Sequence, residues 1–114
     1  MSTRAQLGVK YSDNSISGCY VHYDGYPSHM LSAIEDYVQR YTTTGLVTLI
    51  SEAQSCGGIR CFNAPPNRET QFLNETEIYV IDENSWGDER LHGTKYKYLV
   101  DYETGKITHR RGDY

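Results

Sequence analysis

The stretch over residues 15–30 constrains this fold most strongly, because it predicts a strand that passes directly into a helix. Residues 16–23 are predicted to form the strand, and Asp24-Gly25 breaks it. Pro27 suits the first helical position, where its missing N–H is no loss and its φ is preset. The corner gathers four side chains at one end of a small sheet: Tyr20, His22, Asp24 and Tyr26.

The predicted strand over residues 16–23 has two faces, and its alternation alone leaves either one as the core face. Cys19 and Val21 share one face, whereas Tyr20 and His22 share the other. We expect Cys19 and Val21 to be the more buried pair. That expectation places Tyr20 and His22 on the more accessible side.

The segments on either side of the corner predict a hairpin and two helices. Leu7 and Val9 alternate with polar or small residues as in a half-buried strand, and Asp13-Asn14 supplies a turn. A helix is predicted over residues 27–42, with Gly45 as a plausible stop. Its apolar stripe comprises Met30, Ile34, Tyr37, Val38 and Tyr41. Residues 46–53 suggest a second, short helix, although 46–50 also fit a buried strand.

The rest of the chain predicts strands and loops. Residues 59–62 suggest a short strand, 63–68 a loop with two prolines, and 77–82 a buried strand before a polar connection. The C-terminal hairpin is the most secure local prediction, because residues 95–102 alternate, Gly105 suits a bulged turn, and residues 106–109 return.

These elements predict one α+β domain over residues 1–114, with residues 1–5 and 110–114 frayed. The expected architecture is a mainly antiparallel sheet of about four to six strands, with one longer and one shorter helix on one face.

Composition restricts the classes of partner. Fifteen acidic and eleven basic residues give a net charge of −4, which argues against an extended nucleic-acid interface and is too balanced for a DNA mimic. Such an interface would need a local basic patch, for which the candidates are Lys95, Lys97, Lys106, Arg110 and Arg111. Eleven tyrosines suit half-buried sheet faces and protein-binding surfaces, since the ring of a tyrosine packs while its hydroxyl stays in contact with water.

Three cysteines and the lack of an apolar run in residues 1–10 predict a cytosolic protein with reduced thiols. No stretch approaches the roughly 20 apolar residues of a membrane span, so no membrane association is predicted. Four residues separate Cys56 from Cys61, not the two that are usual in zinc knuckles, and a second ligand pair is lacking. Neither a metal nor a cofactor is therefore predicted.

His22, Asp24 and His29 are the best catalytic candidates, because histidine titrates near neutrality and a carboxylate can orient it. The alternative is structural: Asp24 shapes the turn, His22 packs beside Tyr20, and His29 is exposed in the first helical turn. The chain has no Walker loop, dinucleotide fingerprint or nucleophile elbow. These absences favour a non-enzymatic protein, and no catalytic residue is assigned.

Three segments carry a resemblance: Gly8-Val-Lys-Tyr, Ser15-Ile-Ser-Gly-Cys-Tyr-Val-His-Tyr-Asp-Gly-Tyr-Pro, and Tyr96-Lys-Tyr-Leu-Val-Asp. Together they resemble small, largely uncharacterised bacteriophage and prophage proteins with a Tyr-x-His-x-Asp-Gly-Tyr-Pro segment. The resemblance covers residues 7–41 well and 94–108 loosely. It implies a phage origin, a location in the host cytoplasm, and a role in the contest with the host.

The first hypothesis is therefore a phage accessory protein that binds and inhibits a host protein, such as a CRISPR–Cas defence component. Its predicted contact residues are Tyr20, His22, Asp24 and Tyr26, then the loop from Asn63 to Arg68. The alternative is a small nucleotide-binding or nucleotide-hydrolysing protein with His22 and Asp24 at a pocket mouth. A third hypothesis is nucleic-acid binding through the basic C-terminal hairpin, and formation of a homodimer stays open.

Overall fold

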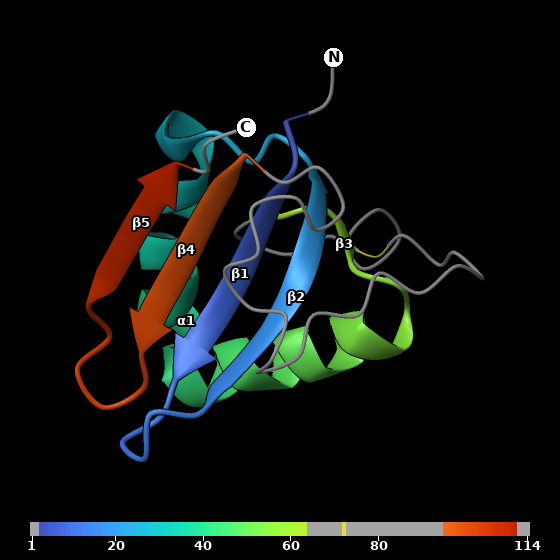
Figure 1. Ribbon diagram of the computed structural model, residues 1–114. Helices are drawn as coiled ribbons and strands as arrows, with labels where there is room; N and C mark the ends of the chain where they lie inside the picture. Colours follow the sequence, from blue (N-terminus) through green and yellow to red (C-terminus); the bar gives the residue numbers. More distant parts are fainter. Residues whose placement is uncertain (1–2, 64–71, 73–94, 112–114) are drawn as a thin grey trace.

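Five strands form one sheet in the order β3-β2-β1-β4-β5 (Figure 1). The computed structural model describes residues 3–63, 72 and 95–111. Predictions for the rest of the loop over 64–68, for the strand over 77–82 and for the connection that follows lie outside these residues. The strands are β1 (Ala5–Lys10), β2 (Ile16–Tyr23), β3 (Ile59–Cys61), β4 (Tyr96–Asp101) and β5 (Ile107–Arg111).

Both predicted hairpins are confirmed, and their turns have the local chemistry expected of them. β1 and β2 pair antiparallel across a turn in which Asn14 has a φ of 70° and the Ser15 N–H donates to Asp13 Oδ1 at 3.0 Å. β4 and β5 also pair antiparallel, and Gly105 between them has a φ of 74°. Positive φ is where asparagine and glycine are best tolerated, so the turns follow from local sterics.

The sheet is mixed, which corrects the prediction of a mainly antiparallel one. β1 pairs with β4 in parallel, and β2 pairs with β3 in parallel. A parallel neighbour requires a crossover connection, and the helix between β2 and β3 provides one of them. The sequence patterns specify hairpin partners, which are adjacent in the chain, but not which distant strand lies beside β1.

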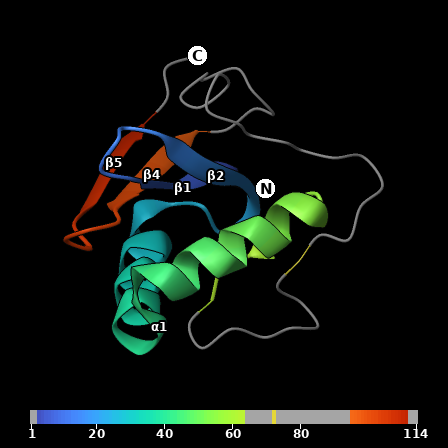
Figure 2. The ribbon, with the colours of Figure 1, turned by 90° about the horizontal axis from the view of Figure 1, so that it is seen from below.

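One face of the sheet is covered by α1 (Pro27–Ser55), which consists of two helical segments that meet at a kink (Figures 1 and 2). Tyr26 is the N-cap residue and Pro27 opens the helix, as predicted. The first segment covers residues 27–41 and the second covers residues 43–55. The longer and the shorter helix are thus confirmed, and the competing strand over residues 46–50 is wrong.

The kink lies at Thr42 and not at the predicted stop, Gly45. Thr42 has φ 65° and ψ 176°, a conformation that is essentially restricted to glycine. Gly45 has a different role, because a Cβ built on it would lie 2.5 Å from the Cβ of Tyr41. The glycine therefore allows the second segment to turn back close to the end of the first.

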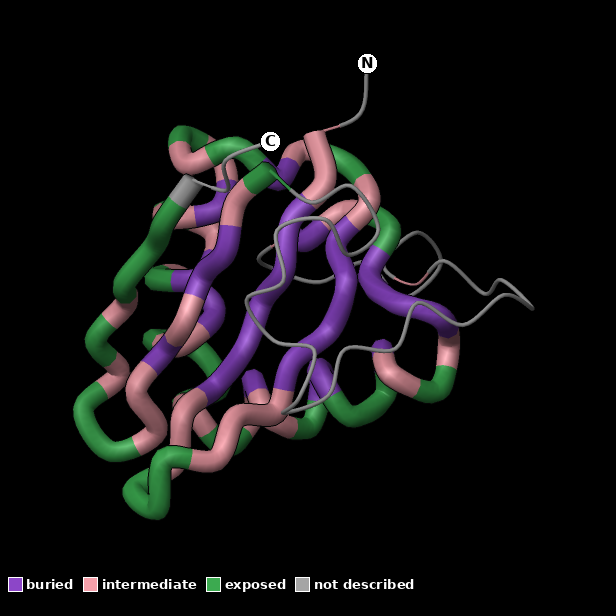
Figure 3. Tube along the Cα trace, viewed as in Figure 1, coloured by how far each residue is buried: buried purple, intermediate pink, exposed green. Residues whose placement is uncertain are grey.

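The main core lies between α1 and the sheet, and it takes apolar residues from β1, β2, β3 and β4. Figure 3 shows that most residues of β1 and the middle residues of β2 are buried. Cys19 and Val21 belong to this core, as predicted. Its fully buried members from the sheet include Ala5, Leu7, Val9, Val21, Ile59, Tyr98 and Val100. Its fully buried members from α1 are Met30, Ile34, Leu46, Ile50 and Ala53.

The centre of the opposite face is also buried, which makes the prediction of an accessible Tyr20 wrong. Gln6 and Tyr20 are 0% exposed and Lys97 is 6% exposed. A Cβ on Gly58 would lie 2.8 Å from the Tyr20 carbonyl oxygen and 3.1 Å from its ring, so the backbone of Gly58 lies directly against Tyr20. We expected only one face of the sheet to be covered, and this expectation is wrong at Tyr20.

The ends of the described chain are hydrogen-bonded to their neighbours, while residues 1–2 and 112–114 of the predicted frayed ends lie outside the described residues. The Thr3 carbonyl accepts the Gly25 N–H at 2.9 Å, and Ala5 is fully buried in β1. Arg110 and Arg111 pair with β4 as part of β5. Among the described residues, no helix combines the length and the apolar character that a bilayer crossing requires.

Candidate functional site

The corner between β2 and α1 is anchored from two directions. Asp24 has a φ of 57°, and the Tyr98 hydroxyl on β4 donates to the Gly25 carbonyl at 2.6 Å. A side chain at Gly25 would lie 2.7 Å from both the Ala5 Cβ and the Thr3 carbonyl oxygen, so only glycine fits. Burial raises the pKa of the Tyr98 phenol well above its usual value, which keeps its proton available for this bond.

His22 is held by the tyrosine two residues before it. The Tyr20 hydroxyl and His22 Nδ1 are 2.7 Å apart and form a hydrogen bond. On the other side, the rings of His22 and Tyr23 meet edge to face with their centroids 4.5 Å apart. His22 is half-buried and lies beside Tyr20, which agrees with the structural alternative.

Asp24 contacts Cys61 at the end of β3, and the sequence did not predict this contact. The Cys61 thiol donates to Asp24 Oδ2 at 3.3 Å, because the parallel register places Cys61 opposite Tyr23. Partial burial and then the Asp24 carboxylate raise the pKa of Cys61. A thiol with a raised pKa holds little thiolate at neutral pH, so Cys61 acts here as a hydrogen-bond donor and not as a nucleophile.

His29 is half-buried, which corrects the expectation that it is exposed. Its Nε2 lies 2.6 Å from the Phe62 carbonyl oxygen. Since a carbonyl only accepts, Nε2 must carry the proton in this bond. The contact ties the first turn of α1 to the end of β3. The three catalytic candidates, His22, Asp24 and His29, are thus engaged by three different partners.

The exposed tyrosines lie around this corner and along the first segment of α1. Tyr23, Tyr26 and Tyr41 are 43%, 39% and 42% exposed. Ring contacts hold each of them against a neighbour: Tyr23 against His22 at 4.5 Å, Tyr26 against His29 at 6.1 Å, and Tyr41 against Tyr37 at 4.7 Å between centroids. We call Tyr23, Tyr26 and Tyr41 together the aromatic surface.

The predicted contact residues therefore divide into three groups. Tyr26 is exposed on the aromatic surface, while His22, Asp24 and Asn63 are half-buried beside it. The Asn63 amide donates to the Cys61 carbonyl at 3.2 Å, which fixes its position next to the corner. Tyr20 is fully buried, and Arg68 lies outside the described residues.

Two members of the aromatic surface were missed by the sequence analysis. Tyr23 shares a strand face with the buried Val21, and Tyr41 ends the apolar stripe of the helix. Both positions therefore indicate packing and not exposure. Each lies at the last position of its strand or helical segment, where the neighbouring element no longer covers it. This terminal position is the one feature of the sequence that could have indicated their exposure.

The described residues contain no group of three or more histidine, cysteine or acidic side chains placed to hold a metal ion. Their three cysteines are free. Cys19 lies in the core, where burial raises its pKa well above the usual value, so it packs as a small apolar residue, as predicted. Cys56 and Cys61 are only partly buried.

Comparison of the chain with protein-family models, with curated proteins and with solved structures finds no match. The geometry of the corner and of the sheet is therefore the basis for any assignment of function.

Proposed function

We propose that this protein is a phage accessory protein that binds a bacterial host protein through the aromatic surface and inhibits it, with a CRISPR–Cas defence component as the proposed target. The observation that carries the proposal is that three tyrosines at the corner and on α1 are exposed among the described residues, each with its ring packed against a neighbouring ring. The resemblance to phage proteins supplies the proposed biological setting.

Exposed tyrosines at fixed positions suit protein recognition. Tyrosine provides a large contact area, has few rotatable bonds and keeps a hydroxyl for a hydrogen bond, so it is enriched at the energetic centres of interfaces. Tyr26 caps a helix whose corner is anchored by the Tyr98 bond, and Tyr41 packs on the buried Tyr37. Such positioned side chains lose little conformational entropy when a partner binds.

The polar groups beside the aromatic surface also suit the polar rim of a protein–protein interface. His22 and Asp24 are half-buried and already form local hydrogen bonds, so they help to position the neighbouring residues of the aromatic surface. Asn63 lies next to them at the end of β3. This arrangement supports a role for these residues in positioning the tyrosines, with Tyr26 as a direct contact.

The test is a phage-plating assay in bacteria that carry an active CRISPR–Cas system targeting the phage. Expression of the wild-type chain is expected to restore plating. The double variant Tyr26→Ala/Tyr41→Ala should lose this effect, because truncation of a central interface tyrosine weakens binding by about tenfold or more per residue.

Glu52→Ala is the matched control, since Glu52 is exposed on the second segment of α1 and lies outside the aromatic surface. It should restore plating like the wild type. Circular dichroism must show that both variants are folded. Equal activity of the double variant and the control would contradict the proposed surface, and no effect of the folded wild-type chain would contradict the proposed target.

A further inference from the structure

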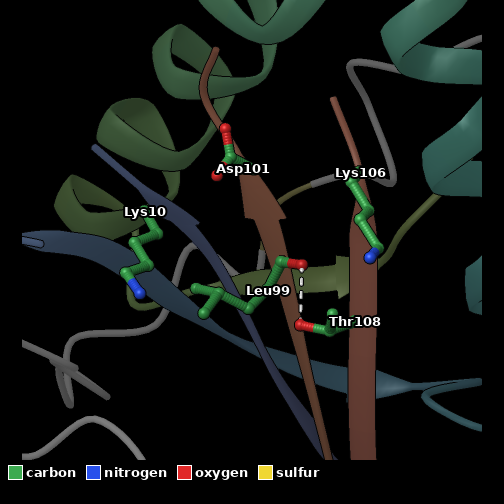
Figure 4. A pocket seen from close by; sticks show the side chains of 5 residues that line it. All are labelled: Lys10, Leu99, Asp101, Lys106 and Thr108. Carbon is green, nitrogen blue, oxygen red and sulfur yellow. Dashed lines mark hydrogen bonds between the residues drawn. The ribbon is translucent and has the colours of Figure 1, made fainter. Parts of the chain in front are cut away.

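A second feature lies at the other end of the strands, on the face turned away from α1. It is a pocket of about 160 Å³ that is partly open to solvent (Figure 4). Five residues line it: Lys10, Leu99, Asp101, Lys106 and Thr108. The volume far exceeds the roughly 10–15 Å³ that one water molecule requires, so the pocket has room for a small ligand group.

The strand pairing explains why these five side chains converge. Lys10 is the Cα partner of Asp101, and Leu99 is the Cα partner of Thr108. Directly paired residues point to the same face of a sheet, and this face is opposite to the one that carries Val9 and Val100 into the core. The pocket therefore follows from the parallel pairing of β1 with β4, which the sequence did not predict.

Three hydrogen-bond donors surround an apolar wall in this pocket. Figure 4 shows Lys10 and Lys106 on opposite sides of Leu99. The Thr108 hydroxyl donates to the Leu99 carbonyl over a long 3.5 Å, so this bond is weak and the hydroxyl is available to a ligand. The pocket thus presents two ammonium groups and one hydroxyl group around the Leu99 side chain.

Asp101 is the one acidic side chain among the lining residues, and it is already engaged. Its Oδ1 accepts the backbone N–H groups of Glu103 at 2.9 Å and Thr104 at 3.1 Å. These backbone bonds, that of Thr104 first, lower the pKa of Asp101, and the nearby Lys10 charge lowers it further, so Asp101 stays ionised. The lining groups therefore sum to one net positive charge, and the carboxylate is directed into the turn.

We propose that this pocket binds the phosphate group of a small phosphomonoester. A phosphomonoester carries nearly two negative charges at neutral pH and three acceptor oxygens, which match two ammonium groups and a hydroxyl. Lysine binds phosphate as a point charge, whereas a planar carboxylate is matched best by the fork of arginine, which the lining residues lack. The proposal uses no residue of the aromatic surface.

The test is a titration of the isotope-labelled full chain, followed by NMR, with inorganic phosphate, AMP and acetate as separate probes. We expect saturable shifts of the Leu99, Lys106 and Thr108 amides with phosphate and AMP, and much weaker shifts with acetate. Single-stranded DNA at the same phosphate concentration is the fourth arm. Shifts as large with acetate or with DNA would overturn the assignment to a phosphomonoester.

Four variants locate the binding site. Lys10→Gln and Lys106→Gln should each weaken AMP binding by about two- to fivefold, the range of exposed ion pairs. Asp101→Asn keeps an oxygen for the turn N–H groups and removes a negative charge, so it should strengthen binding by a similar factor. Lys95→Gln is the matched control, because Lys95 is exposed at the other end of β4.

Unchanged affinity in both lysine variants, or an equal loss in Lys95→Gln, would overturn the proposed pocket. The same variants should restore phage plating like the wild type, since they lie outside the aromatic surface. Failure of the phosphate site and failure of the proposed inhibitor function are therefore distinguishable.

Discussion

At the scale of single residues, the corner depends on a few contacts with strict geometric requirements. Pro27 and the turn residues Asn14 and Gly105 were predicted correctly, because their backbone conformations follow from local sterics. Tyr20 and His29 were predicted incorrectly. Their burial depends on Gly58 and Phe62, which are more than thirty residues away in the chain, so a local pattern contains no signal for it.

The Tyr98 hydroxyl provides a direct test of how the corner is held. Tyr98→Phe removes the donor to the Gly25 carbonyl and leaves that buried acceptor without its partner. We expect a loss of about 1–2 kcal/mol in the free energy of unfolding, measured by urea denaturation. Tyr26→Phe is the control, because Tyr26 is exposed and should change stability little. Equal effects of the two variants would show that the bond does not anchor the corner.

Thr42 is the residue at which the chain stores backbone strain. Its φ of 65° and ψ of 176° suit glycine, so Thr42→Gly should raise the free energy of unfolding by about 1 kcal/mol. Thr48→Gly, in the regular part of the second segment, should instead lower it by up to about 1 kcal/mol. Urea denaturation of both variants measures the difference. A loss of stability in Thr42→Gly would contradict the strained conformation.

At the scale of elements, sequence periodicity identified the strands and helices that the structure describes, but only the hairpin pairings between them. β1 with β2 and β4 with β5 are close in the chain, so turn chemistry specifies them. The parallel pairing of β1 with β4 joins segments about ninety residues apart. The phosphate pocket arises from that pairing, which is why no sequence motif indicated it.

Both hairpin turns are held by an ionised aspartate, which predicts a specific acid sensitivity. The side-chain bond from Ser15 is the main cause that lowers the pKa of Asp13, and the backbone bond from Thr104 is the main cause for Asp101. A lowered pKa in the folded state means stability that is present above the usual value of about 3.9 and is lost as the pH falls through the folded pKa.

Carboxyl titration by NMR should therefore place Asp13 and Asp101 below pH 3.9. Ser15→Ala removes the 2.6 Å hydroxyl bond and should move the Asp13 titration upward while leaving that of Asp101 unchanged. Titration of both groups at the ordinary value would contradict the turn geometry.

At the scale of the whole molecule, the corner and the phosphate pocket lie at opposite ends of one sheet. Tyr23 and Tyr26 lie where β2 leads into α1, and the phosphate pocket lies where β1 and β4 end. Tyr41 lies at the far end of the first α1 segment, near the end of β4, since the Thr43 hydroxyl donates to the Tyr102 carbonyl at 2.9 Å. The α+β class and the corner could be predicted from the sequence because they depend on periodicity and turn residues. Tyr26 was among the predicted contact residues, but Tyr23 and Tyr41 could not be predicted, since their exposure depends on where neighbouring elements stop.

Site-specific photo-crosslinking in infected or prophage-bearing bacteria tests the aromatic surface most directly. A photoreactive phenylalanine analogue would replace Tyr26, Tyr41 or the control residue Glu52, one at a time. We predict that the probes at Tyr26 and Tyr41 crosslink to the same host protein and that the probe at Glu52 does not. Crosslinks to that protein from Glu52 but from neither tyrosine would contradict the proposed binding surface.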